Sequence, residues 1–159
     1  MTHPIRRAIT ALLAVSALPL MTGPASAADP AEVKVAVVVP LSGPSSLLMA
    51  LSVSGLNGQS FAFVGYLPVD AAARSARIRE LEALSRRYNQ TQLMIETPYR
   101  NQALMGALVS ALSATTRLSV SCGLTLPAGW TRSDSVSGWR LKPCILPSDT
   151  PAVFGLLGV

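Results

Sequence analysis

The chain has 159 residues, of which 50% are hydrophobic and only 13% are charged, and its mean hydropathy is +0.42. Soluble domains carry about 25% charged residues, so this composition excludes a disordered or acidic solvating protein. The net charge of +5 comes from basic residues that are scattered along the chain, which supports weak attraction to polyanions but indicates no defined nucleic-acid groove. The length suits one domain with a real core and is too short for two full ones.

Histidine and cysteine are nearly absent, which excludes several kinds of catalytic and metal site. The one histidine is His3, so the body of the chain holds no Ser–His or Cys–His pair and no histidine-built zinc site. Cys122 and Cys144 are too few for a four-thiolate zinc or iron–sulfur site, and we predict no metal. We expect two small buried thiols. The alternative is a disulfide, which requires an exported chain.

The first 27 residues have the pattern of a secretory signal peptide. Arg6 and Arg7 precede an apolar run that ends at Leu20, and residues 25–27 have the small side chains of a cleavage site. The run is too short and too interrupted for a stable membrane span. We therefore interpret residues 1–27 as a signal-like segment and residues 28–39 as a strand and junction.

Strand and helix signals alternate along the rest of the chain. The expected strands are short and apolar or alternating: 33–39, 61–64, 92–96, 118–122 and 152–158. The expected helices are 47–54, 71–88 and 101–113, with Ser45, Ser46 and Asp70 as N-caps and Gly55 as the first stop. Residues 127–148 carry mixed signals. This alternation predicts an α/β fold with a single open mixed sheet flanked by helices.

Apolar stripes predict the buried faces of two helices. In the 71–88 helix the stripe is Ile78, Leu81, Leu84 and Tyr88, and in the 101–113 helix it is Leu104, Leu108 and Leu112. The residues expected to face water in the 71–88 helix are Arg74, Arg77, Glu80 and Arg87. The alternative for that arginine-rich face is contact with RNA.

Three segments that follow predicted strands carry the least core-like residues, at 42–46, 96–100 and 123–127. In open α/β sheets, ligands bind outside the carboxyl ends of the strands. Gly43 allows close backbone approach to a ligand, and the helix that begins near Ser46 offers free N–H groups. These features predict a small-molecule site without specifying a reaction.

Glu96 is the only acidic residue in these segments. It either accepts hydrogen bonds from a ribose or an amino group, or pairs structurally with Arg100. Thr97 and Thr125 are either turn hydroxyls or ligand contacts. The chain contains no phosphate-binding P-loop and no G-x-G-x-x-G motif.

Several blocks in order resemble the C-terminal half of the tetrapyrrole (corrin/porphyrin) methylase family. The longest is GPSSLLMALSVSGLNGQSFAFVGYLP at 43–68, and the others are IETPYRN at 95–101, LTLP at 124–127, WR at 139–140 and PAVF at 151–154. The likeness covers about residues 40–159. It is nearest to the branch that includes the small-subunit ribosomal RNA ribose methyltransferases.

The resemblance implies methyl transfer from S-adenosylmethionine, which binds in a cleft between two α/β lobes. It implies that residues 40–159 form the second lobe and that eight residues bind the cofactor: Gly43, Pro44, Ser45, Ser46, Glu96, Thr97, Leu124 and Thr125. The acceptor would be an RNA ribose or a tetrapyrrole. No catalytic residue is assigned, because the donor's sulfonium makes the methyl group reactive without a protein nucleophile.

The chain departs from that family at its N-terminal end. The first lobe, with its glycine-rich cofactor loop, has no counterpart here, and residues 27–44 are similar to the mature start of periplasmic branched-chain amino-acid binding proteins. A rival alignment sets residues 23–30 against the segment that precedes the second lobe in the methylases.

Three functional hypotheses follow. The first, which we adopt, is a truncated cytoplasmic methyltransferase lobe with weak or no turnover alone, whose cleft a homodimer could rebuild. The second is an exported, periplasmic or secreted amino-acid binding module. The third is an inactive remnant.

Overall fold

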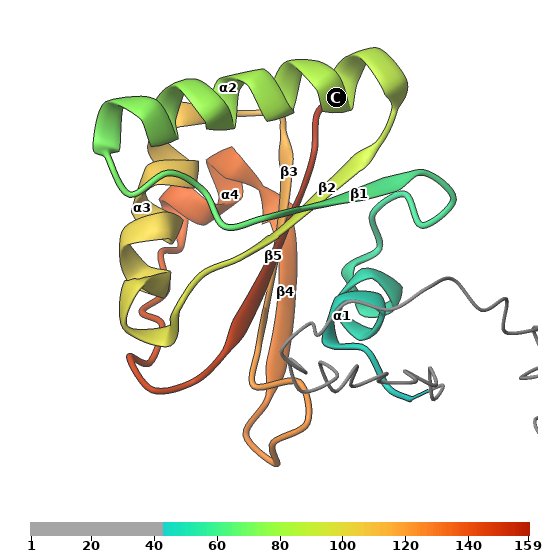
Figure 1. Ribbon diagram of the computed structural model, residues 1–159, viewed down its shortest axis with the longest axis vertical. Helices are drawn as coiled ribbons and strands as arrows, with labels where there is room; N and C mark the ends of the chain where they lie inside the picture. Colours follow the sequence, from blue (N-terminus) through green and yellow to red (C-terminus); the bar gives the residue numbers. More distant parts are fainter. Residues whose placement is uncertain (1–42) are drawn as a thin grey trace, which may run out of the picture. The chain divides into compact units, whose positions relative to one another are not determined.

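The computed structural model describes residues 43–159, which lie in one compact unit of the chain (Figure 1). The signal-like segment, the junction and the strand expected at 33–39 lie outside the described residues. The helices are α1 (Ser46–Ser54), α2 (Ala71–Tyr88), the 3-10 turn η2 (Pro98–Arg100), α3 (Asn101–Ala111) and α4 (Val136–Leu141). The strands are β1 (Phe61–Gly65), β2 (Thr91–Ile95), β3 (Arg117–Cys122), β4 (Trp130–Ser135) and β5 (Ala152–Leu157).

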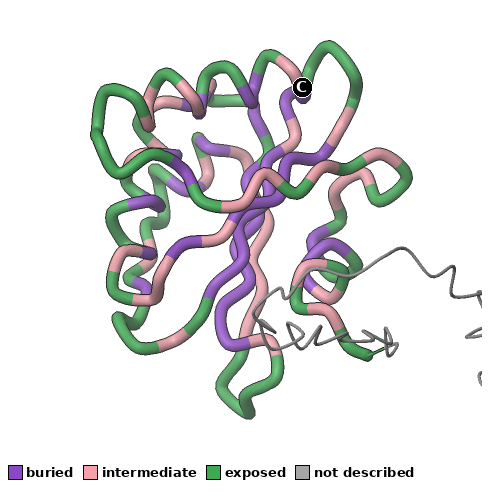
Figure 2. Tube along the Cα trace, in the orientation of Figure 1, coloured by how far each residue is buried: buried purple, intermediate pink, exposed green. Residues whose placement is uncertain are grey.

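These strands form a single open sheet in the order β1-β2-β5-β3-β4. Only β1 and β2 are parallel, and the other neighbours are antiparallel, so the prediction of a mixed sheet flanked by helices is confirmed. The last strand in the sequence, β5, is the central one. Its uninterrupted apolar run suits that place, because a strand covered on both faces has no polar side to present (Figure 2).

The main core lies between the sheet and the three helices α2, α3 and α4. It joins Met94, Phe154 and Leu156 of the sheet to Ile78 of α2 and Trp139 of α4. The opposite face of the sheet carries the apolar Leu93 and Val153 beside the small Ser119, Ser121 and Gly155. Helix α1 packs over the half of this face that β5, β3 and β4 form. Gly155 permits this close packing, since an added Cβ would lie 3.1 Å from the Cδ1 of Leu56 and 3.2 Å from the Cδ2 of Leu93.

Helix α2 begins as predicted, because the Asp70 carboxylate accepts a hydrogen bond of 2.8 Å from the Ala73 N–H. Its predicted stripe is only partly correct: Ile78 and Leu81 are buried, Leu84 is half-buried and Tyr88 is exposed. With about 100° of rotation per residue, Leu84 lies roughly 60° beyond Leu81 on the side away from the buried face. Tyr88 lies close to the direction of Leu81 and is exposed at the last residue of the helix. Glu82 and Ser85 occupy the buried positions instead.

Two expected water-facing residues of α2, Arg74 and Arg77, are also half-buried rather than exposed. Arg74 bends back to donate to the Val69 carbonyl at 3.3 Å, and Arg77 pairs with Glu80 at 2.7 Å. Both aliphatic stems therefore lie along the helix surface while the guanidinium groups bind nearby oxygens. The other two residues of the predicted polar face, Glu80 and Arg87, are exposed.

The mixed-signal region contains β4 and α4, which the sequence patterns did not predict. β4 reads WTRSDS and is half-buried along its whole length, so it shows no alternation of apolar and polar residues. Such a pattern is typical of an edge strand. Cys122 is buried and Cys144 is half-buried, and both thiols are free, so the disulfide alternative is not supported. Burial raises the pKa of both thiols.

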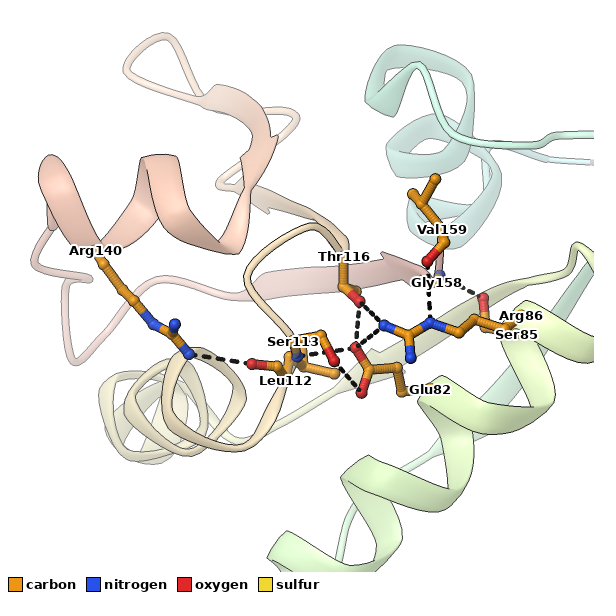
Figure 3. A network of polar contacts seen from close by, with 9 residues as sticks. All are labelled: Glu82, Ser85, Arg86, Leu112, Ser113, Thr116, Arg140, Gly158 and Val159. Atoms are coloured by element: carbon orange, nitrogen blue, oxygen red, sulfur yellow. Dashed lines mark hydrogen bonds and ion pairs between the residues drawn. The ribbon is translucent and has the colours of Figure 1, made fainter.

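A polar network around the buried Glu82 carboxylate lies at the end of the sheet where β3 begins and β5 ends (Figure 3). The Glu82 carboxylate accepts hydrogen bonds from the Ser113 N–H at 2.9 Å and from the Thr116 hydroxyl. The Arg86 guanidinium lies 3.2 Å from Glu82 and donates to the Val159 carbonyl at 3.1 Å. This carboxylate therefore joins α2, the end of α3 and the start of β3.

Candidate functional site

A cavity of about 490 Å³ lies at the opposite end of the sheet from this network. Its walls come from the segments that follow β2 and β3 and from the segment that enters β5. Strands β2 and β3 both run antiparallel to β5, so their carboxyl ends and the amino end of β5 share one edge. The lining residues are Ser46, Tyr66, Ile95, Glu96, Thr97, Pro98, Ser121, Gly123, Leu124, Thr125, Leu126, Pro151, Ala152 and Val153.

Five of the eight sequence-predicted cofactor residues line this cavity: Ser46, Glu96, Thr97, Leu124 and Thr125. The other three, Gly43, Pro44 and Ser45, line a second cavity of about 490 Å³ along the outer side of α1. Leu124 borders both cavities, so the predicted residues gather in two neighbouring hollows. Whether they contact a cofactor stays a prediction.

Glu96 is buried and already paired within its own segment. Its Oε1 accepts hydrogen bonds from the Thr97 N–H at 2.9 Å and from the Thr97 hydroxyl at 3.3 Å. Its Oε2 lies 3.0 Å from the NH2 of Arg100, a close ion pair without the angles of a hydrogen bond. Of the two roles considered for Glu96, the structure shows the ion pair with Arg100. A buried carboxylate requires such a partner.

The loop that carries Leu124 and Thr125 is shaped by backbone hydrogen bonds. Gly123 has a φ of +60°, which favours glycine, and its N–H donates to the Pro151 carbonyl at 2.9 Å. The Leu126 N–H then returns to the Gly123 carbonyl at 2.8 Å. A tight turn therefore presents this loop beside the segment that enters β5.

Sequence reasoning missed the wall formed by Tyr66 and residues 151–153. Tyr66 follows a strand in the apolar stretch GYLP, and residues 151–153 lie where β5 begins. The rule for ligand sites pointed instead to polar residues after strands. Because β5 is antiparallel to β2 and β3, its amino end reaches the edge at which their carboxyl ends lie. An apolar run directly after Pro151 was the only signal for this wall.

The lining that residues 43–159 provide is mostly apolar and contains hydroxyl groups, one carboxylate and no lysine, arginine or histidine. A cavity of this size and character suits a small molecule with a flat apolar part and a few hydrogen-bonding groups. In residues 43–159, no group of three or more His, Cys, Asp or Glu side chains could hold a metal ion.

No protein-family model matches the chain. Among curated proteins, it is 38% identical over 88 residues to ribosomal RNA small subunit methyltransferase I of Mesorhizobium japonicum, which spans 55% of this chain and 29% of that protein. The protein of the same name from Vibrio cholerae is 43% identical over 63 residues, or 40% of this chain and 20% of the relative. The chain thus spans less than a third of these relatives.

Among solved structures, the chain is similar to the methyltransferase CobJ, with a TM-score of 0.47 and 12% identity over 74% of this chain and 49% of CobJ. Among the curated relatives, a third protein named ribosomal RNA small subunit methyltransferase I, from Xylella fastidiosa, is 50% identical over 44 residues. All three of these curated relatives are named as methyltransferases. They confirm that part of this chain resembles the tetrapyrrole methylase family, in the branch of the ribosomal RNA small-subunit methyltransferases.

Proposed function

We propose that residues 43–159 form the cofactor-side lobe of an S-adenosylmethionine-dependent methyltransferase, and that the cavity at the sheet edge receives the adenosyl part of the cofactor. One observation carries the proposal. Ser46, Glu96–Thr97 and Leu124–Thr125 are far apart in the sequence, belong to separate blocks of the methylase resemblance, and line one cavity.

The chemistry of the cavity fits such a ligand. Its volume of about 490 Å³ falls in the range of small-molecule sites, and its apolar walls suit a nucleoside base. Ser46, Thr97 and Thr125 of the lining carry hydroxyl groups, which are suitable hydrogen-bond partners for a ribose. The lining residues from the described part of the chain include no cation that would repel a sulfonium.

S-adenosylmethionine, when bound, supplies an electrophilic methyl group. The residues of this lobe bind the adenosyl part, orient it and exclude water from one side, which are the tasks that such a transfer needs from protein. Glu96 holds the wall through Thr97 and Arg100 rather than acting as a base.

The acceptor follows from the relatives only as a proposal. The curated relatives are named as ribosomal RNA methyltransferases, and we propose an RNA ribose as the acceptor and the cytoplasm as the site of action. Because the family's cleft needs a first lobe, we expect residues 43–159 alone to bind cofactor without measurable methyl transfer. None of the helices in that stretch is long and apolar enough to cross a bilayer.

Isothermal titration calorimetry of the chain with S-adenosylmethionine and S-adenosylhomocysteine tests the proposal. Thr125→Ala is expected to weaken binding about two- to tenfold, the value of one neutral hydrogen bond. Thr115→Ala is the matched control, since Thr115 is also exposed and lies before β3 at the other end of the sheet. Absence of binding by the unmodified chain, or equal binding by both variants, would contradict the proposal.

Titration of a branched-chain amino acid into the same chain distinguishes the methyltransferase proposal from the amino-acid binding module. Heat with the amino acid and none with either nucleoside would support the binding-module hypothesis instead.

A further inference from the structure

Asn101 is fully buried, yet it lies outside the cavity lining. It is the first residue of α3, and its Nδ2 donates a hydrogen bond of 3.0 Å to the Thr150 carbonyl. Thr150 directly precedes residues 151–153, which form the β5-side wall of the cavity. The side chain therefore contacts the backbone of that wall from behind.

The segment that enters β5 depends on few contacts of this kind. Residues 147–149 are exposed and have no regular secondary structure. The Leu146 N–H donates to the Oε1 of Gln102 at 2.8 Å, and the Gly123 N–H donates to the Pro151 carbonyl at 2.9 Å. Between these two hydrogen bonds along the chain, the Asn101 side-chain amide connects Thr150 to α3.

The side chain of Asn101 also carries a cost that stability alone does not explain. Its Oδ1 is buried and has no hydrogen-bond partner among the described residues. An unpaired buried acceptor is unfavourable, and such groups call for a reason beyond packing. Holding the Thr150 carbonyl in place beside the cavity is that reason.

The neighbouring residue holds the facing wall. Arg100 pairs with Glu96, which together with Thr97 lines the β2 side of the cavity. Two consecutive residues at the start of α3 thus bind both walls: the Arg100 guanidinium pairs with the Glu96 carboxylate, and the Asn101 side-chain amide donates to the Thr150 carbonyl.

We propose that Asn101 is a positioning residue of the cavity, which sets the place of residues 151–153 through the Thr150 carbonyl. The inference deepens the proposed function and rests on it for the identity of the ligand. The role of Asn101 in the geometry of the wall is independent of the proposed function.

Amide hydrogen exchange of Gly123 tests the geometry directly, because its N–H donates to the carbonyl of Pro151, the residue after Thr150. Asn101→Leu keeps the number and branching of the side-chain heavy atoms and removes the donor. Ser85→Ala is the matched control, since the buried Ser85 hydroxyl accepts the Gly158 N–H at 2.8 Å at the other end of the sheet. Asn101→Ala is the second variant, should the leucine not be accommodated.

Both the Asn101 and the Ser85 variants are expected to lower Tm. Only the Asn101 variants should accelerate Gly123 exchange, by about tenfold relative to the control, through local opening. Equal exchange of Gly123 in the Asn101 and Ser85 variants would overturn the proposal.

Affinity for S-adenosylhomocysteine is the second readout. It should fall about tenfold in the Asn101 variants and stay unchanged in Ser85→Ala. If the unmodified chain binds no S-adenosylhomocysteine, the proposed function fails, and the exchange of Gly123 alone decides the role of Asn101.

Discussion

The two ends of the sheet contain buried carboxylates with the same local pairing and different roles. Glu82 pairs with Arg86 and Glu96 pairs with Arg100, each four residues further along the chain. Glu82 also receives hydrogen bonds from residues more than thirty positions away, after α3 and before β3. Glu96 is satisfied by its own segment alone.

This difference distinguishes a carboxylate that stabilises the fold, Glu82, from one that lies beside the proposed ligand site, Glu96. At the Glu82 end, the carboxylate joins α2 to the segment between α3 and β3 (Figure 3). At the Glu96 end, the carboxylate is held sideways by Thr97 and Arg100, so the space between β2 and the β3 loop stays open as a cavity. A carboxylate that binds only its own segment leaves room for a ligand.

The largest expected effect tests the Glu82 end. Glu82→Gln removes the charge and places an amide among donors, so we expect unfolding free energy to fall by about 3 kcal/mol in urea denaturation. Glu80→Gln is the control, because Glu80 forms only an exposed pair with Arg77, and it should cost less than about 1 kcal/mol. Similar losses in the two variants would remove the distinction between the network and the surface.

A matched change at the other end sharpens the comparison. Glu96→Gln should lower unfolding free energy by about 2 kcal/mol, less than Glu82→Gln, because its partners are few and local. Urea denaturation of both variants side by side measures the difference. A greater loss at Glu96 than at Glu82 would reverse the roles assigned to the two ends.

Glycines test the shape of the cavity wall. In Gly129→Ala the added Cβ would lie 2.0 Å from the Gly123 carbonyl oxygen, so the loop must shift, at a cost of about 1 to 2 kcal/mol. Its affinity for S-adenosylhomocysteine should fall with it. Gly106→Ala in α3 is the control, because its Cβ would meet nothing within 4 Å and should stabilise the helix by about 0.5 to 1 kcal/mol. Unchanged affinity in Gly129→Ala would show that this loop does not shape the site.

The smallest expected effect concerns acid stability. The hydrogen bond from Arg132 holds the pKa of Asp134 below its ordinary value of 3.8. A lowered pKa in the folded state stabilises the protein above the unfolded pKa, and this contribution is lost as the pH falls through the folded pKa. The difference in Tm between the unmodified chain and Asp134→Asn should therefore be present at neutral pH and vanish in acid. A difference that persists in strong acid would contradict this.

Local patterns predicted what local chemistry determines. The Asp70 cap and the Gly55 stop are confirmed, and the strand-end rule brought Glu96, Thr97 and Leu124 to one cavity. The buried face of α2 was only partly predicted, because Glu82 and Ser85 are buried by partners that follow α3 and β5, which no window along the helix contains.

Long-range pairing accounts for the other misses. β4 has no apolar face because it is an edge strand, so its hydropathy shows no period. The wall at residues 151–153 depends on β5 running against β2 and β3, and direction within a sheet is not visible in the composition of a strand.

The central place of β5 also governs how this lobe can assemble. The pairs β1–β2 and β3–β4 share no ladder until β5 lies between them. During synthesis these two halves cannot be joined until β5 has emerged from the ribosome. Folding therefore depends on contacts of long sequence separation, which slows it and exposes apolar sheet edges in the meantime.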